Sequence, residues 1–423
     1  MKIYIRQVSI LDSTSPHHGK IKDVWIEDGT IKQISDPGSI IEKADKTIDG
    51  NRKHLSTGWF DLHVNFREPG FEYKEDLSSG CKAATAGGFT GVLCMPSTMP
   101  PIQSKSEIEL ISTKTKNELT DVFSAGVLSA NRNGKDLAEM YDMSLAGALA
   151  FTDDKECVQD AGLMLRGLLY SKIFDGLIMS YGNDKNLSVN GQMNEGVMST
   201  QLGLKAIPTL AEDLIINRDL FLADYAGAKI HFSTVSSAKA VDLIREAKKK
   251  GMPVTCDVAA HQLMLDDSLL HDFDTNYKVK PPLRSKEDVL ALRKALADGT
   301  IDAISSDHSP EDIENKKREF DHAAFGIIAL ETAFAVANTA MQKQIPLDKL
   351  IEKLTVNPRK ILQLPLPCIR EGESANLTLF DSEAAWKFEE HHIKSKSKNT
   401  PFAGMTLKGK PVAVFNKGRF EEC

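Results

Sequence analysis

The sequence lacks several features that would place it in a specialised class of protein. No apolar run approaches the roughly 20 residues that a membrane-spanning helix needs. No two of its six cysteines form a Cys-x-x-Cys pair, so a structural zinc site built on cysteine is not expected. Internal repeats and low-complexity segments are also missing, and a net charge of −7 argues against a general nucleic-acid binder.

The remaining composition is that of an ordinary globular protein. The 423 residues are 41% hydrophobic and 26% charged, and they suffice for one large α/β domain plus a smaller one. Cysteines scattered through a chain of this length predict mostly buried, reduced thiols and therefore a cytoplasmic protein. The first ten residues alternate and carry charge, unlike a secretory signal.

Eight short apolar runs, separated by helix-like segments, are the strongest indication of fold. Near-continuous apolar runs are typical of parallel strands covered on both faces. A representative segment between them is 236–250, with Ser236 and Ser237 as helix caps and Gly251 as the stop. This alternation predicts an α/β fold, a (β/α)8 TIM barrel, in preference to a doubly wound open sheet. The runs span residues 59–65, 90–95, 121–128, 147–152, 176–181, 229–235, 253–259 and 301–306.

The two ends of the chain have a different pattern from the middle. Residues 1–55 and 365–423 alternate in the manner of antiparallel strands, with turns predicted at Asp28-Gly29 and at 416–418. We expect the two terminal segments to form one small β-sandwich domain. Residues 56–364 would then make up the barrel.

Polar residues gather where the predicted barrel strands end, which is where such barrels carry their chemistry. The first strand ends in His63, Asn65 and Arg67. The other strand ends add Ser97, Asp153, Asp154, Tyr181, Thr234, His261 and Asp307. The weakly periodic stretch 182–206 is expected to be a loop over the same end, and residues 394–399 a polar loop without a role.

The most informative motif covers residues 60–70, Phe-Asp-Leu-His-Val-Asn-Phe-Arg-Glu-Pro-Gly. It is similar to the strand of cyclic-amide hydrolases that carries Asp-x-His-x-His and then Arg-Glu-Pro-Gly. Two histidines one residue apart on a strand point the same way and can hold one metal, but the second position here is Asn65. Together with further matching segments, the motif makes the chain resemble a dihydroorotase of the type found beside aspartate carbamoyltransferase, within the amidohydrolase superfamily. Those segments are CMPSTMP (94–100), FTDD (151–154), MNEG (193–196), PPLRSKED (281–288), ALADGTIDAISSDHSP (295–310), FGIIALET (325–332), SKSKNTPFAG (395–404) and GKPVAVFNKG (409–418).

The resemblance implies a reaction and a set of metal ligands. The family interconverts carbamoyl-aspartate and dihydroorotate with a zinc-bound hydroxide, and Asp307 is the expected proton carrier. The implied ligands that remain are His63, either Asp153 or Asp154, and Asp307. Lys155 replaces the glycine that usually follows the aspartate pair. Three histidine ligands are missing, at Asn65, Tyr181 and Thr234.

The substrate-binding positions are altered as well. The resemblance assigns Arg67 to the substrate carboxylate and Ser97 to a position where the family has asparagine. Lys280 replaces another asparagine, and Glu311 replaces a histidine and would repel an anionic substrate. His261 completes the expected substrate-binding set, although it does not lie at a ligand position and is expected to be a hydrogen-bonded interior histidine.

Two hypotheses follow from these losses. The first is a catalytically silent homologue without a metal that serves as a structural partner of aspartate carbamoyltransferase, itself a homo-oligomer. The alternative is an active dihydroorotase, or a related cyclic-amide hydrolase, with a reduced one-zinc site on His63, Asp153 or Asp154, and Asp307. Neither hypothesis involves nucleic acid or a membrane.

Overall fold

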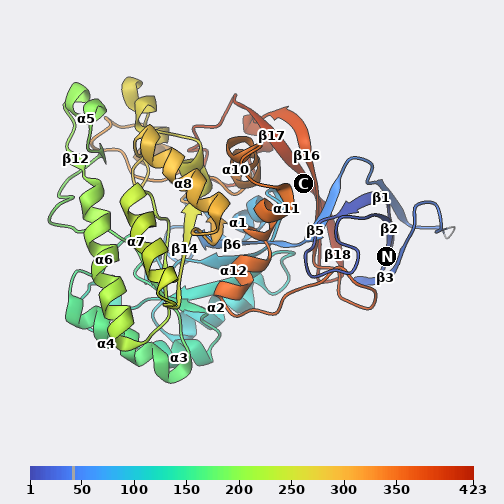
Figure 1. Ribbon diagram of the computed structural model, residues 1–423, viewed down its shortest axis with the longest axis horizontal. Helices are drawn as coiled ribbons and strands as arrows, with labels where there is room; N and C mark the ends of the chain where they lie inside the picture. Colours follow the sequence, from blue (N-terminus) through green and yellow to red (C-terminus); the bar gives the residue numbers. More distant parts are fainter. Residues whose placement is uncertain (41–42) are drawn as a thin grey trace.

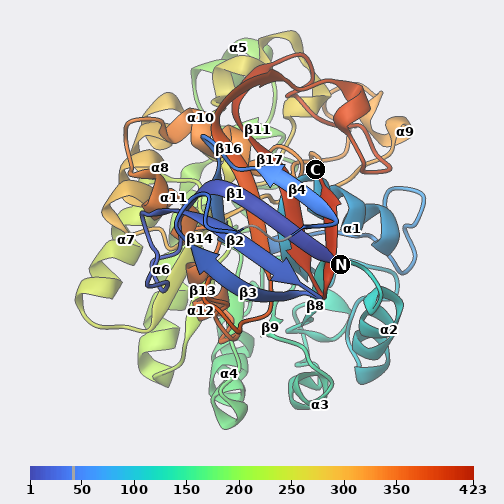
Figure 2. The same ribbon diagram turned by 90° about the vertical axis from the view of Figure 1, so that its right-hand side faces the viewer.

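The computed structural model describes residues 1–40 and 43–423, and it consists of a barrel ringed by helices and a sheet at one side of it (Figure 1). Strands from both ends of the chain make up that sheet, which faces the viewer in Figure 2. Within the described residues, no helix combines the length and the apolar character needed to cross a membrane.

The barrel consists of eight parallel strands in the order β15-β14-β13-β10-β9-β8-β7-β6. It is nearly closed, because Val64 bridges to His308 and the Asn65 amide donates to the His308 carbonyl at 2.8 Å. Each of the eight apolar runs in the sequence overlaps one of these strands, so the predicted barrel is confirmed. The strands are β6 (Trp59–Val64), β7 (Phe89–Cys94), β8 (Asp121–Gly126), β9 (Ala150–Phe151), β10 (Ile178–Ser180), β13 (Ile230–Phe232), β14 (Val254–Ala259) and β15 (Ala303–Ser305).

The helices follow from capping and apolar periodicity. In α7 (Ala238–Lys249), the Ser237 hydroxyl accepts from the Ala240 amide at 2.9 Å, while Val241 and Ile244 face the barrel and are buried. The helix ends before Gly251, whose φ is +78°. The others are α1 (Leu77–Ala86), α2 (Lys105–Thr115), α3 (Met140–Leu145), α4 (Ala161–Ser171), α5 (Val197–Leu202), α6 (Thr209–Ala226), α8 (Lys286–Asp298), α9 (Ile313–Lys316), α10 (Ala333–Met341), α11 (Leu347–Glu352) and α12 (Val356–Ile361).

The terminal sheet runs in the order β18-β17-β16-β5-β1-β2-β3, with β4 also paired to β1. Antiparallel pairing of β5 with β16 joins the N-terminal strands to the C-terminal ones. Apolar side chains from both groups pack into one cluster, so the sheet encloses its own core as the layers of a sandwich do. The bounds are β1 (Lys2–Ile10), β2 (Ile21–Glu27), β3 (Thr30–Ser35), β4 (Lys46–Asp49), β5 (His54–Thr57), β16 (Leu377–Lys387), β17 (Thr406–Asn416) and β18 (Arg419–Glu422).

Both predicted hairpin turns of this sheet are present, and they touch. Gly29 and Gly418 have φ values of +75° and +70°. A Cβ atom on Gly29 would lie only 2.5 Å from the Cα of Gly418. Glycine is therefore required at position 29 both for its backbone conformation and for the close approach of the second turn.

Two segments that were expected to be loops, 182–206 and 394–399, are more structured or more buried than expected. Residues 182–206 include α5 and most of a small two-stranded parallel sheet of β11 (Met193–Asn194) and β12 (Ala206–Ile207). These short elements have too few residues for a periodic pattern to appear in the sequence. Residues 394–399 do lack helix and strand, but Ser395 is only 2% exposed because this segment packs against the barrel mouth.

The six cysteines are free, and four of them are buried.

Candidate active site

The barrel strands end in tight turns that converge on one region. Arg67, Asp154, Thr234 and Asp307 all have positive φ, between +53° and +62°. Non-glycine residues seldom adopt this conformation, and where they do it is often at functional sites. Through these turns, Asp154 and Asp307 both approach His63. Thr234 and Asp307 both contact Lys155.

His63 lies at the centre of this region and faces two carboxylates. Its Nε2 atom is 2.9 Å from Asp154 Oδ1 and 3.5 Å from Asp307 Oδ1, and all three side chains are at least 95% buried. Its Nδ1 atom is 3.0 Å from the Ser233 hydroxyl, which itself donates to Asp257. Burial and the Lys155 ammonium lower the pKa of His63, but the two carboxylates outweigh them and the net shift is upward. The pKa of Asp154 is held far below its usual range, because the opposing effect of burial is exceeded by His63. The two carboxylates therefore favour the protonated form of the imidazole.

A second cation, Lys155, enters the same region. Its Nζ atom is 2.9 Å from Asp307 Oδ1 and donates to the Thr234 hydroxyl at 3.0 Å. The ammonium also lies 5.0 Å from the centroid of the Tyr181 ring, within cation–π range. Two of the positions where the resemblance expects histidine ligands, Tyr181 and Thr234, thus contact a lysine.

The donor set does not match a catalytic zinc centre. Such a centre needs three protein ligands and an open position for water. Across residues 1–40 and 43–423, no three His, Cys, Asp or Glu side chains are arranged so that they could hold a metal ion. The amide oxygen of Asn65, which has no hydrogen-bond partner in the described part of the chain, is a poor zinc ligand compared with imidazole, and Lys155 brings a positive charge to Asp307.

The two adjacent aspartates have different partners. Asp154 faces His63, whereas Asp153 binds backbone: its Oδ1 atom accepts from the amides of Leu128 at 3.0 Å and Ser129 at 2.9 Å. Asp153 therefore fixes the loop after β8, and Asp154 is the one that the fold brings to the centre.

The residue expected to bind the substrate carboxylate is already paired. Arg67 Nη2 lies 2.9 Å from Glu311 Oε1 and donates to the Ser309 hydroxyl at 2.8 Å. The other Glu311 oxygen is 2.6 Å from Lys74 Nζ. An internal carboxylate thus occupies the guanidinium that would meet an external one.

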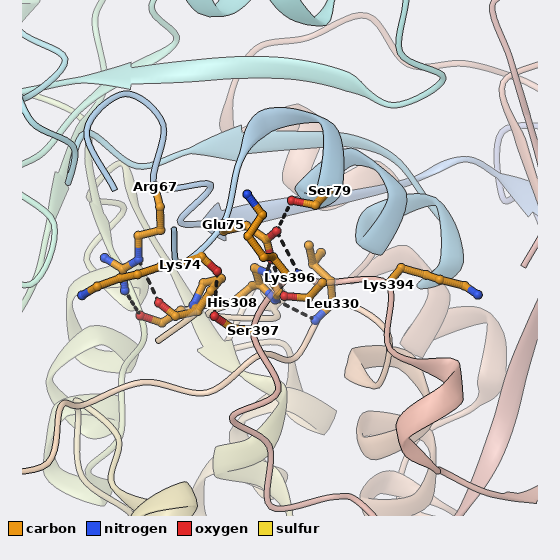
Figure 3. A network of polar contacts seen from close by, with 12 residues as sticks. Arg67, Lys74, Glu75, Ser79, His308, Leu330, Lys394, Lys396 and Ser397 are labelled. Atoms are coloured by element: carbon orange, nitrogen blue, oxygen red, sulfur yellow. Dashed lines mark hydrogen bonds and ion pairs between the residues drawn. The ribbon is translucent and has the colours of Figure 1, made fainter. Parts of the chain in front are cut away.

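A buried polar network around Glu75, missed by the sequence analysis, connects the barrel mouth to the C-terminal segment 394–399 (Figure 3). Glu75 is fully buried and accepts from the hydroxyls of Ser79 and Ser395 and from the Lys396 amide. Burial would raise the pKa of Glu75, but these donors and His308 lower it overall. Little in the local sequence marks Glu75, because its partners other than Ser79 lie over 200 residues away.

The remaining expected site residues are divided between the mouth and the interior. Ser97 donates to Asp154 and lines the mouth cavity. His231 bonds to Asp257 and Thr255 at 2.8 Å each, as an interior histidine. The expectation that His261 is hydrogen-bonded is wrong, since neither ring nitrogen has a partner among the described residues.

A cavity of about 290 Å³ opens above these residues. Its lining carries charges of both signs: Arg67, Lys74 and Lys155 are paired with Glu311 or Asp307, while Arg132 and Lys280 add further positive charge. Among the lining residues are Asn65, Arg67, Ser97, Lys155, Lys280 and Glu311.

Comparison with known proteins defines the family. The family model "Dihydro-orotase-like" matches residues 52–240, and the "Amidohydrolase family" model matches residues 186–420. A protein from Syntrophus aciditrophicus named dihydroorotase is 42% identical over 421 residues, 99% of each chain. The chain belongs to the dihydroorotase family. Another relative of that name, from Carboxydothermus hydrogenoformans, is 43% identical over 95% of this chain and 94% of its own.

Solved structures of this superfamily share the fold. An L-hydantoinase from Arthrobacter aurescens superposes with a TM-score of 0.84 at 23% identity, covering 99% of this chain and 95% of its own. A D-hydantoinase gives a TM-score of 0.81 at 21% identity, with the same coverage. At these identities the likeness concerns the barrel and terminal sheet alone.

His261 leads to a prediction about how the folding stability depends on pH. Burial lowers the pKa of His261 from its ordinary value of 6.5 to about 4. Below pH 6.5 the unfolded chain therefore binds a proton that the folded chain does not, and stability falls until pH 4. Going from pH 7 to pH 5, this residue should remove about 2 kcal/mol of folding free energy.

The measurement is chemical unfolding of wild type and His261→Leu at both pH values. The variant should lose about 2 kcal/mol less than wild type on acidification. Equal losses in the two proteins would show that His261 titrates alike in the folded and unfolded states.

Proposed function

We propose that this member of the dihydroorotase family does not carry out the family reaction and serves as a structural partner of aspartate carbamoyltransferase. The observation that carries the proposal is the position of the Lys155 ammonium, 2.9 Å from Asp307 and 3.0 Å from the Thr234 hydroxyl. A metal that activates water would have to share Asp307 with this cation.

The loss of activity follows from charge and ligand number. Hydrolysis of a cyclic amide at neutral pH requires a strong nucleophile, which zinc supplies by lowering the pKa of its bound water to about 7. Asn65, Tyr181 and Thr234 replace three histidines of the family pattern. His63 and Asp307 remain, but both are engaged in ion pairs.

The substrate side supports the same proposal. Dihydroorotate and carbamoyl-aspartate carry carboxylates, and Arg67 is the expected partner for one of them. Glu311 holds Arg67 and Lys74 together through both of its oxygens. A substrate would have to displace a buried carboxylate that has two cationic partners, and this weakens binding.

The surface offers support for a role in assembly. Helix α6 leaves four large apolar side chains between 46% and 80% exposed, and they recur at helical spacing: Leu210, Leu214, Phe221 and Tyr225. Apolar side chains gathered on one exposed face are typical of protein contact surfaces.

The test combines an assay with a binding measurement. Protein incubated with zinc should give no dihydroorotate hydrolysis above buffer, while the Syntrophus aciditrophicus relative is assayed beside it as the positive control. Purified aspartate carbamoyltransferase from the same organism should co-elute with the chain in size exclusion.

Two results would contradict the proposal. Turnover with about one zinc per chain, abolished by Asp307→Ala, would establish the reduced one-metal enzyme instead. Separate elution together with unaltered transferase kinetics would eliminate the structural partnership.

A further inference from the structure

The backbone just before Lys155 is anchored by several hydrogen bonds. The Asp153 carbonyl accepts two bonds from the Arg132 guanidinium, at 3.2 and 3.1 Å, and its carboxylate is bound to the β8 loop. Asp154 then takes a φ of +53°, and the Asp154 amide donates to the Thr152 hydroxyl at 3.0 Å. The turn that leads into Lys155 is thus anchored through Asp153 and through the Asp154 amide.

The ammonium has partners suited to a cation on several sides. Asp307 supplies a carboxylate, Thr234 a hydroxyl oxygen and Tyr181 the negative face of a ring. Asp307 and Asp154 are each 4% exposed, so neither negative charge is solvated by bulk water. Two buried carboxylates that lie this close together are costly unless a cation lies beside them.

We infer that Lys155 is a built-in replacement for a divalent metal ion: its ammonium holds Asp307 in place, balances the charge of the buried carboxylates and keeps metal out. The site is then one substitution away from a metal site on His63, Asp154 and Asp307. The inference rests on the same site as the proposed function. Its test measures metal content and stability, and neither quantity depends on a partner protein or on turnover.

Two substitutions separate the charge of Lys155 from its bulk. Lys155→Gly, the residue expected there from the family resemblance, removes both the ammonium and the side chain. Lys155→Met removes the charge but retains a side chain in the same space. A double variant with His63→Ala shows whether any metal gained sits at this site.

Each purified protein is loaded with zinc or cobalt, desalted and analysed for metal. Lys155→Gly should hold about one equivalent, with the visible absorption of protein-bound cobalt, because Asp307 becomes free to join His63 and Asp154 as a third protein ligand. Wild type, Lys155→Met and the double variant should hold none at this site.

Stability is the second reading. Without metal, both single variants should unfold several degrees below wild type, because each leaves Asp307 without its cation. Zinc should restore the melting temperature of Lys155→Gly and leave that of Lys155→Met unchanged. If the glycine variant folds only when zinc is present, that also supports the inference.

Any of three results would overturn it. Wild type could hold a full equivalent of metal with Lys155 in place. The folded glycine variant could take up none, or no more than Lys155→Met. Both single variants could melt at the wild-type temperature without metal.

Discussion

Replacing Arg284 with methionine is expected to lower the free energy of unfolding by about 3–5 kcal/mol. Arg284 is 1% exposed and its Nη2 atom lies 3.1 Å from Glu212, which is 3% exposed. It also donates to the Ser236 hydroxyl, the Asn194 side chain and the Ile207 carbonyl at 2.9 to 3.1 Å. Removing the guanidinium leaves the buried Glu212 carboxylate with hydrogen bonds from Ser236 and Ser237 but without its cation, and this is the costly case for a buried ion pair.

Denaturant unfolding followed by circular dichroism measures this loss. Arg245→Met is the matched control, because Arg245 pairs at the surface with Asp242 and Asp298, and it should change stability by less than about 1 kcal/mol. Replacing Arg284 and Glu212 together by apolar residues should restore part of the loss. Equal effects of the Arg284 and Arg245 substitutions would show that the buried pair contributes no more than a surface one.

Trp59→Ala is expected to have a similar effect, about 3–5 kcal/mol, through packing. Trp59 begins β6 and is fully buried, with ring centroids 4.6 Å from Phe334 and 5.3 Å from Phe380. Phe380 belongs to β16 of the terminal sheet and Phe334 to α10, so the indole packs between the sheet and the barrel. Its removal opens a cavity where three elements meet.

The control is Trp386→Ala, because Trp386 is only partly buried at the outer part of β16. Unfolding of both variants is followed by denaturant titration, and Trp386→Ala should cost clearly less. If the two substitutions cost the same, the cluster around Trp59 does not couple the sheet to the barrel.

The sequence predicted the barrel and the joined termini well, because both leave a regular pattern. Strand runs such as 90–95 are mostly apolar, and the Ser237 cap and Gly251 stop are local signals that tertiary contacts did not override. The excursion 182–206 was less well predicted, since its strands of two residues are held by distant partners such as Arg284.

The candidate site was predicted as a set of residues and not as an arrangement. His63, Asp154 and Asp307 come together as the strand ends required. The sequence identified Lys155 and Glu311 as departures from the family pattern, but not their partners. A long flexible side chain can reach many points of a barrel mouth, so only the fold determines which carboxylate or guanidinium it meets.

The pairing of β5 with β16 also bears on how the chain is made. The first five strands leave the ribosome early, yet the edge of β5 stays open until residue 377 and beyond have been synthesised. At about 5–20 residues per second, the interval of some 320 residues lasts about 16–64 s. For that time an unpaired strand edge is exposed in the growing chain, so chaperones that bind extended segments should associate with this protein before its synthesis ends.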